Sequence, residues 1–228
     1  MTRERRPGTP ANSSRSLSSQ SGMDLSLPKL YPITDVSLSG RSHAEQVESL
    51  AAGGAALIQL RDKNASPRNL YDSALAAMKA ARRLGVLLIV NDRVDIAIAA
   101  GADGVHLGQD DLPPERARLL LGPDRIIGFS THTLEQALAA DCLAVDYIAI
   151  GPMFQTSTKE RPDPVVDLEV LGEIKRRVSK PLVAIGGITL ERARLVIEAG
   201  ADSIAVISDL YSAGDLTART REFIQRLS

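Results

Sequence analysis

The feature that most limits the fold of this 228-residue chain is an alternation of short apolar runs with longer helical stretches, which begins at Lys29. Short, continuous apolar runs are typical of parallel strands that are buried on both faces. The repeated order of strand and helix predicts an α/β fold built from βα units. The expected strands are residues 30–34, 57–60, 87–90, 104–107, 126–129, 147–150, 182–185 and 203–207.

The number of these units favours a closed sheet over an open one. Open doubly wound sheets usually have about five or six strands, whereas eight βα units with tight glycine turns fit a barrel. Residues 100–105 (AGADGV) and 199–204 (AGADSI) repeat the same order of helix end, turn and strand start about half a barrel apart, which is a weak internal repeat. We therefore expect a single (β/α)8 TIM barrel over residues 29–228.

Local chemistry marks two of the helices that cover this barrel. Ser66 is an expected N-cap and precedes Pro67 at the first helical position, so a helix is predicted over residues 67–84. Thr189 is expected to cap a second helix, which Gly200 ends.

Residues 1–28 differ from the rest, since they are rich in Ser and Arg and have no apolar periodicity. We expect a disordered tail there. The basic, acid-poor composition raises the alternative of an organelle transit peptide, but no amphipathic helical pattern is present. Met23 is a second candidate for the natural start.

Composition excludes several classes of partner. A net charge of -1 and 3% aromatic residues give little attraction to a nucleic-acid backbone and few rings for base stacking. No run approaches the roughly 18 apolar residues of a membrane span. Cys142 is the only cysteine, so no intrachain disulfide forms, and we expect a buried, inert thiol in a cytoplasmic protein.

In a barrel of this kind, polar residues at the carboxyl ends of strands are candidates for the active site. Gln59, Arg61 and Lys63 follow one another at alternate positions at the end of the second expected strand. Alternation places all three on one side of the sheet, where an amide, a guanidinium and an ammonium converge on one anion. A diphosphate is a suitable ligand.

Carboxylates follow the next two expected strands. Asp92 comes directly after the third strand, and Asp110 and Asp111 follow the fourth. Oxygen ligands from neighbouring loops, together with a diphosphate, are the usual way in which a protein holds Mg²⁺. We assign Asp92 and Asp111 to Mg²⁺, with Asp110 as a competing ligand or capping residue.

The fifth expected strand ends near two further polar residues, Ser130 and His132, both of which are candidates for the barrel mouth. No acid at a suitable spacing completes a Ser-His-Asp triad, so hydrolase chemistry has little support. His132 is either structural or functional, and His106, within the fourth strand, is interpreted as a satisfied group of the barrel lining.

The loops after the last three expected strands are expected to bind phosphate. The long loop after the sixth strand carries Thr156, Ser157, Thr158 and Lys159, whose hydroxyls and ammonium suit phosphate oxygens. Residues 185–189 (IGGIT) and 207–210 (ISDL) follow the last two strands, where barrels often form a phosphate cup from backbone N–H groups. The carboxylate of Asp209 would repel a bound phosphate, so we expect it to point away or to cap the following helix.

Taken together, these motifs resemble the thiamine-phosphate synthase family over residues 29 to about 210. The resemblance is carried by QLRDK at 59–63, VND at 90–92, GVHLGQDD at 104–111, GPMFQTSTK at 151–159, IGGI at 185–188 and VIS at 206–208. It implies a transferase that condenses 4-amino-2-methyl-5-(diphosphooxymethyl)pyrimidine with 5-(2-hydroxyethyl)-4-methylthiazole phosphate or its carboxylated form. The products are thiamine phosphate and diphosphate, with CO₂ from the carboxylated form.

The resemblance also implies roles for single residues. Contacts with the pyrimidine diphosphate are expected from Gln59, Leu60, Arg61, Asp62, Lys63, Asn91, Ser130 and Lys159. Contacts with the thiazole phosphate are expected from Thr156, Ser157, Thr158, Gly187, Ile207 and Ser208. Asp92 and Asp111 match the Mg²⁺ ligands, and the catalytic groups are Arg61, Lys63, Ser130 and Lys159. The chain departs from the family at Gln155, where Pro is common, and at Asp209, where a small residue is usual.

Three alternatives stay open at this point. A related thiazole tautomerase would use a histidine such as His132 for acid-base isomerisation. A noncatalytic phosphate-binding barrel would use only the cup at Gly187 and Ser208. Sugar-phosphate isomerases and epimerases share that cup, but they need an acid-base pair that the sequence does not present. The oligomeric state is open as well, a homo-oligomer included.

Overall fold

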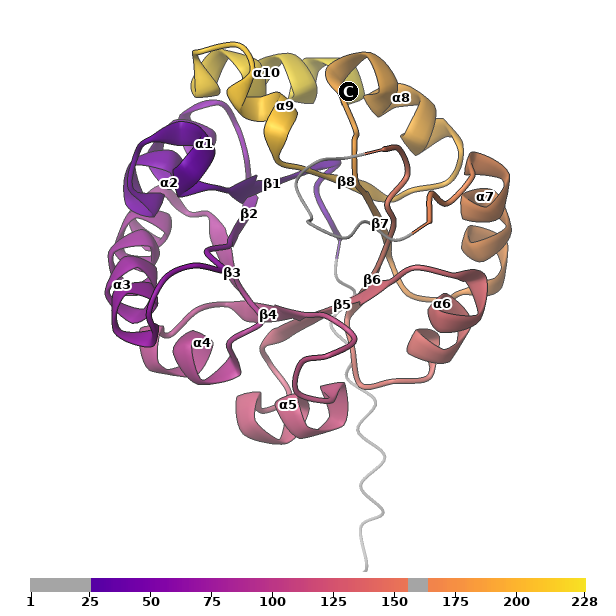
Figure 1. Cartoon of the computed structure of the whole chain (residues 1–228), viewed down its shortest axis with the longest axis horizontal. Helices are drawn as coiled ribbons and strands as arrows, with labels where there is room; N and C mark the ends of the chain where they lie inside the picture. The colour runs from indigo at the N-terminus through magenta and orange to yellow at the C-terminus, as the bar shows by residue number, and fades with distance from the viewer. Residues whose placement is uncertain (1–25, 156–163) are drawn as a thin grey trace, which may run out of the picture.

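The computed structural model describes residues 26–155 and 164–228. Within these ranges eight parallel strands close into a barrel in chain order, and β8 pairs with β1 (Figure 1). The strands are β1 Leu30–Thr34, β2 Leu57–Leu60, β3 Leu87–Asn91, β4 Gly104–Leu107, β5 Ile126–Thr131, β6 Tyr147–Ile150, β7 Leu182–Ile185 and β8 Ser203–Val206. The prediction of a closed (β/α)8 barrel is confirmed. β3 and β5 run slightly further than predicted, and β8 ends earlier.

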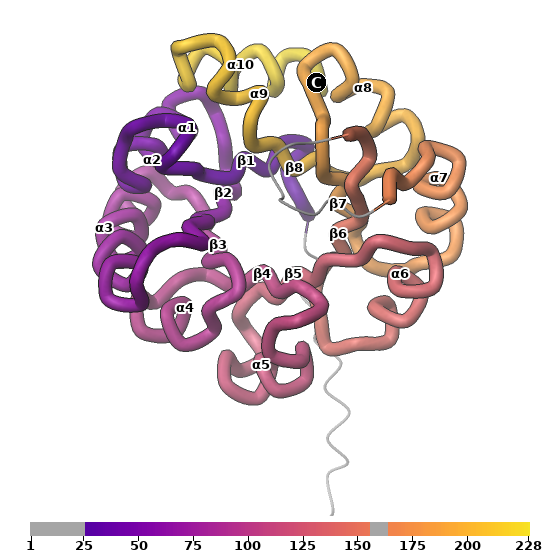
Figure 2. Tube along the Cα trace, viewed as in Figure 1, coloured from indigo at the N-terminus to yellow at the C-terminus, as the bar shows by residue number. Residues whose placement is uncertain are grey.

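Helices surround the barrel on its outside (Figure 1). They are α1 Val36–Ser39, α2 His43–Ala52, α3 Pro67–Leu84, α4 Val94–Ala100, α5 Pro114–Leu121, α6 Leu134–Asp141, α7 Leu168–Arg177, α8 Leu190–Glu198, α9 Ser208–Tyr211 and α10 Leu216–Leu227. The last helix, α10, packs against both α2 and α8 and so closes the outer ring (Figure 2).

The two helix starts that were predicted from sequence have different outcomes. The hydroxyl of Ser66 accepts a hydrogen bond from the Asn69 N–H, and Pro67 opens α3 as expected. Thr189 lies at the N-cap position of α8, but its side chain accepts no capping bond. The carboxylate of Asp209 takes that place, since it accepts a bond of 3.2 Å from the Leu190 N–H. A residue distant in sequence has therefore replaced the local cap.

The expectation that Cys142 is buried is wrong. Cys142 is exposed, because it is the C-cap of α6 and lies in the turn before β6. The buried apolar run begins only at Val145.

Strand alternation divides the buried side chains into two layers. Side chains that point outward, such as Ile58, Leu88 and Ile148, pack between the sheet and the helices. Those that point inward form a smaller cluster inside the barrel, which includes Tyr31 and Tyr147. Leu27, which the sequence analysis placed in the tail, packs against this inner cluster. The rest of the expected tail, residues 1–25, lies outside the described residues.

The inner cluster needs one strand position without a side chain. Gly128 of β5 pairs with Tyr147 of β6 in the strand register. A Cβ atom at Gly128 would lie 2.0 Å from Cζ of Tyr147, far inside van der Waals contact. Glycine at this position therefore allows the tyrosine ring to cross the barrel interior.

No helix of the described residues is long and apolar enough to cross a membrane.

We expect Gly128→Ala to lower the free energy of unfolding by about 2–3 kcal/mol, because the added methyl group overpacks the barrel interior. Urea denaturation measures the change. Gly40→Ala is the matched control: Gly40 has φ +65° and open space around its Cβ position. That control should cost only about 1 kcal/mol, from the left-handed backbone alone. Equal costs for the two variants would show that Tyr147 does not fill the space beside Gly128.

Candidate active site

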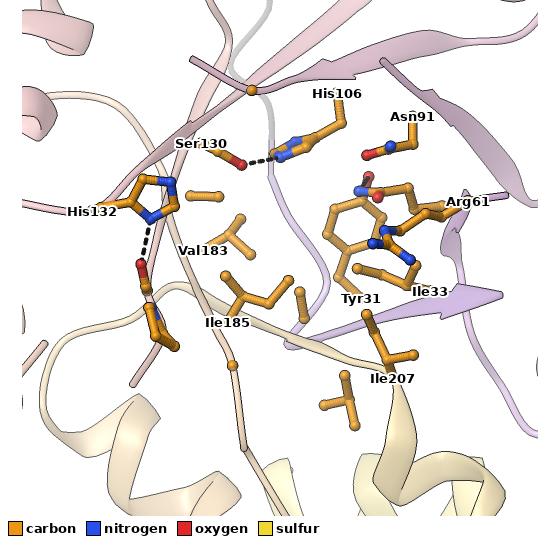
Figure 3. A pocket seen from close by; sticks show the side chains of 18 of the residues that line it. Tyr31, Ile33, Arg61, Asn91, His106, Ser130, His132, Val183, Ile185 and Ile207 are labelled. Atoms are coloured by element: carbon orange, nitrogen blue, oxygen red, sulfur yellow. Dashed lines mark hydrogen bonds between the residues drawn. The ribbon is translucent and has the colours of Figure 1, made fainter. Parts of the chain in front are cut away.

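A cavity of about 470 Å³ lies at the carboxyl ends of the strands, with walls from all eight of them or from the residues that follow (Figure 3). The sequence-predicted residues that line it are Gln59, Arg61, Lys63, Asn91, Asp92, Asp111, Ser130, Gly187, Ile207 and Ser208. Thr156, Ser157, Thr158 and Lys159 lie outside the described residues.

Two of the expected contact residues do not line the cavity, because strand alternation turns their side chains away. Leu60 is fully buried in the layer between sheet and helices. Asp62 instead holds its own loop: one carboxylate oxygen accepts hydrogen bonds of 3.0 Å from the N–H groups of Asn64 and Ala65. The other oxygen lies 3.7 Å from Nε2 of His43.

One wall of the cavity is cationic. Arg61 and Lys63 both line it, as the alternation after β2 predicts, and Figure 3 shows Arg61 beside Tyr31 and Ile33. The ammonium of Lys63 lies 3.7 Å from the Asp92 carboxylate, but the lysine side chain is 55% exposed. An ion pair in that position contributes little to stability, so Lys63 is available to a ligand.

The carboxylates of Asp92 and Asp111 lie close enough to interact directly. Burial and the negative charge of Asp111 raise the pKa of Asp92 from 3.8 to about 6. Asp111 is fixed by a hydrogen bond of 2.7 Å from the Gly108 N–H. Asp110 also lines the cavity and is exposed. Among the described residues, no group of three or more His, Cys, Asp or Glu side chains is arranged to hold a metal ion.

The backbone at Asp92 is strained. Its φ is +62°, a value that residues other than glycine rarely adopt. The Arg93 N–H donates to the Asn91 carbonyl at 2.7 Å and closes a tight turn around Asp92, whose own N–H donates to the His106 carbonyl at 2.8 Å. Strain of this kind is held by its surroundings and is common at functional sites.

A buried polar chain that the sequence analysis did not predict forms the floor of the cavity. Gln59 bonds to Tyr31, Tyr31 to Tyr147, Tyr147 to His106, and His106 to Ser130. The interpretation of His106 as a satisfied lining residue agrees with these contacts. The signals that would have located the tyrosines were their inward-facing strand positions and the glycine at 128.

His106 and Ser130 approach each other as in a hydrolase, but the third partner is absent. The hydrogen-bond partner of the other ring nitrogen, Nδ1, is the Tyr147 hydroxyl at 2.9 Å, and no carboxylate of the described residues bonds to the ring. Burial lowers the pKa of His106 to about 4. A histidine with this pKa is a weak general base at neutral pH.

His132 is held at the cavity wall from two sides. Its Nδ1 lies 2.7 Å from the Gly151 carbonyl oxygen (Figure 3). Its backbone N–H donates to the Gln136 side chain at 2.7 Å. The bond to Gly151 orients the ring and favours a structural role for it.

The wall opposite the acidic pair is formed by the turns after β7 and β8. Gly186, Gly187, Ile207 and Ser208 line it. Gly187 has φ +63°, and a Cβ there would lie 2.6 Å from the Gln155 carbonyl oxygen, so only glycine fits beneath the β6 loop.

Asp209 points away from this cup, in agreement with the expectation from the sequence. Its carboxylate pairs with Arg219 of α10 at 2.6 Å and also accepts from the start of α8. Both side chains of the ion pair are largely buried, so a negative charge is neutralised behind the cup. A phosphate in the cup is therefore not repelled by a free carboxylate.

The chain matches known proteins over most of its length. Residues 30–210 match the family model described as thiamine monophosphate synthase. A thiamine-phosphate synthase of Koribacter versatilis is 50% identical, with 89% of this chain and 97% of the relative covered. A thiamine-phosphate synthase of Chloroflexus aurantiacus is 47% identical, with 85% and 90% covered.

A solved structure agrees with these relatives. The thiamine phosphate pyrophosphorylase of Pyrococcus furiosus superimposes with a TM-score of 0.79 at 41% identity, covering 87% of this chain and 95% of that one. Because the family model covers residues 30–210 and a relative at 50% identity spans most of the chain, this chain belongs to the thiamine monophosphate synthase family.

Proposed function

We propose that this chain is a transferase that joins 4-amino-2-methyl-5-(diphosphooxymethyl)pyrimidine to 5-(2-hydroxyethyl)-4-methylthiazole phosphate, or to its carboxylated form. The products are thiamine phosphate and diphosphate, with CO₂ from the carboxylated substrate. The observation that carries this proposal is one cavity that is lined by Arg61 and Lys63 after β2 and by the glycine turn and Ser208 after β7 and β8, which we propose as two anion-binding walls. Two phosphorylated substrates require two such walls within reach of each other.

The pyrimidine diphosphate belongs on the wall after β2 and β3. Arg61 and Lys63 supply the positive charge, and Gln59, Asn91 and Ser130 supply hydrogen-bonding groups at the cavity wall. Bonds between charged groups and phosphate oxygens are about twice as strong as bonds between neutral groups. Leu60 and Asp62 support this loop from behind, since their side chains point away from the cavity.

The thiazole phosphate belongs in the cup formed by Gly187, Ile207 and Ser208. Backbone N–H groups that converge on one point bind phosphate without added positive charge. We propose that further contacts with the thiazole phosphate come from the loop that follows β6 in the sequence. The residues concerned, Thr156, Ser157, Thr158 and Lys159, lie outside the described residues.

Asp92 and Asp111 fit Mg²⁺. Two carboxylates that repel each other in a partly buried site gain from a divalent cation between them, and Mg²⁺ commonly takes one or two carboxylates together with substrate phosphates. Bound there, the ion would neutralise charge on the diphosphate.

The bond between the pyrimidine methylene carbon and the diphosphate oxygen breaks in a dissociative substitution. Arg61, Lys63 and Ser130 stabilise the diphosphate as negative charge grows on it, and Lys159 is assigned the same role. The aminopyrimidine delocalises the methylene cation, which the thiazole nitrogen then attacks. The walls of the cavity hold the two reactants together, so no protein nucleophile is needed.

The arrangement does not favour the alternatives. A tautomerase has little need of the cationic wall and the acidic pair, and Nδ1 of the His132 ring lies 2.7 Å from the Gly151 carbonyl oxygen. A simple phosphate binder needs only the cup.

We further propose a single catalytic domain over residues 29–228 in a cytoplasmic protein. The closed barrel and a chain with one cysteine support this.

Incubation of the purified chain with both substrates and Mg²⁺ should yield thiamine phosphate and diphosphate in equal amounts. Chromatography of the first product and a coupled assay of the second measure them. Excess EDTA should stop the reaction, and added Mg²⁺ should restore it. A folded protein that binds both substrates and forms neither product would contradict the proposed function.

Asp92→Asn should act in opposite directions on stability and activity. The pKa of Asp92 is raised in the folded state, so its ionised form destabilises the fold. In EDTA, the free energy of unfolding of the parent protein should therefore include a favourable contribution from protonated Asp92 below about pH 4. That contribution, on the order of 1–2 kcal/mol, should be lost as the pH rises through 6. The variant should lack this loss.

The activity of the same variant should fall on the order of 100-fold in Mg²⁺, because a metal ligand is lost. Asp95→Asn is the control: Asp95 is an exposed residue of α4 that pairs only with Arg93 among the described residues, and its replacement should leave activity unchanged. An Asp92→Asn variant that is less stable than the parent protein at pH 7 in EDTA would contradict the charge repulsion between Asp92 and Asp111.

A further inference from the structure

The polar chain beneath the cavity connects five side chains from five different strands or strand ends. Its four contacts measure 3.2 Å from Gln59 to Tyr31, 3.0 Å from Tyr31 to Tyr147, 2.9 Å from Tyr147 to His106 and 2.8 Å from His106 to Ser130. The first four residues are buried, and Ser130 reaches the cavity wall (Figure 3). Gln59, Tyr31 and His106 also border the cavity, and Ser130 is the one member of this polar chain that is only partly buried.

The direction of every hydrogen bond in this polar chain follows from the amide of Gln59 at its first position. The amide nitrogen of Gln59 only donates, so the Tyr31 hydroxyl accepts from it. Among the described residues, the remaining partner of that hydroxyl is Tyr147, so Tyr31 places its own hydrogen on the Tyr147 oxygen. Tyr147 must then donate to Nδ1 of His106. Gln59, Tyr31 and Tyr147 then each donate one hydrogen to the next group of the polar chain.

The protonation of His106 is set by the same rule. Because Nδ1 accepts from Tyr147, the single hydrogen of a neutral ring is on Nε2 and is donated to Ser130. A charged ring would donate from Nδ1 as well and would leave the Tyr31 hydrogen without an acceptor in the described part of the chain. The low pKa of His106, caused by burial, agrees with a neutral ring.

Resting on the function proposed above, we propose that Tyr147 and His106 are positioning residues that turn the Ser130 hydroxyl hydrogen into the cavity, where it donates to the substrate diphosphate. Ser130 already accepts from Nε2 of His106, so its own hydrogen is directed elsewhere. The Gln109 side chain fixes the backbone at the same residue, through a bond of 2.6 Å to the Ser130 carbonyl. Ser130 is then a preorganised donor to the leaving group rather than a nucleophile, because His106 has no free lone pair to take its proton.

The tautomer of His106 tests this direction without any substrate. Nitrogen-15 NMR of the histidine rings should show Nε2 protonated and Nδ1 unprotonated in the parent protein. In Tyr147→Phe, which removes the donor to Nδ1, the Nδ1 resonance should shift toward that of a ring without this bond. Tyr211→Phe is the control, because it removes a hydroxyl that bonds to Gln46 and Ile33 and is not part of the hydrogen-bonded series from Gln59 to Ser130. A proton on Nδ1 in the parent protein would reverse every bond and overturn the proposal.

A double-variant cycle tests whether Tyr147 acts through Ser130. Tyr147→Phe should lower kcat at least about tenfold in the parent protein, but less than about twofold in the Ser130→Ala background. A purely structural role for Tyr147 would produce the same loss in both backgrounds, and that result would contradict the proposal. Tyr211→Phe should leave kcat within about twofold of the parent in either background.

Two further measurements separate this inference from the proposed function. His106→Gln can place an amide N–H near the position of Nε2, so it should retain at least about fivefold more kcat than His106→Leu. If the parent protein makes no thiamine phosphate, the affinity for inorganic diphosphate replaces kcat in the same cycle. Failure of the synthase assay then refutes the activity, whereas additive effects on diphosphate affinity refute the role of Tyr147.

Discussion

The pairing of β8 with β1 is the constraint on which the rest of the structure depends, because it closes the sheet. Closure leaves no open edge and places all strand ends on one ring, so that residues far apart in sequence share one cavity. Strand alternation then sends successive side chains either to the helix layer or to the barrel interior. Arg61 and Leu60 are adjacent in sequence, yet only Arg61 lines the cavity.

The cavity holds features that work against stability. Asp92 has a left-handed backbone and a carboxylate beside that of Asp111, and strained backbone of this kind is common at functional sites. The rigid ring of strands and helices maintains this arrangement. The acidic pair and the cationic residues Arg61 and Lys63 lie on one side of the mouth, and the glycine cup lies on the other. Among the described residues, the charged groups of the site are therefore confined to one wall, away from the cup.

The site also depends on residues that touch no substrate in the proposed mechanism. Arg219 of α10 neutralises Asp209 behind the proposed phosphate cup, and the same carboxylate accepts a hydrogen bond from the first N–H of α8. Gly128 leaves the space that Tyr147 occupies, and Tyr147 in turn connects Tyr31 with His106. The electrostatics of the cavity are therefore set partly by packing in the barrel interior.

The sequence by itself determined the succession of strands and helices and the positions of polar residues at strand ends. Those features follow from local periodicity, which is why most of the strand bounds and the shared side of Gln59, Arg61 and Lys63 were predictable. Only the tertiary structure decided that Asp209 turns to Arg219, or that Tyr31 meets a tyrosine 116 residues away. Such pairs depend on barrel closure and on the space between side chains, and neither leaves a periodic signal in the chain.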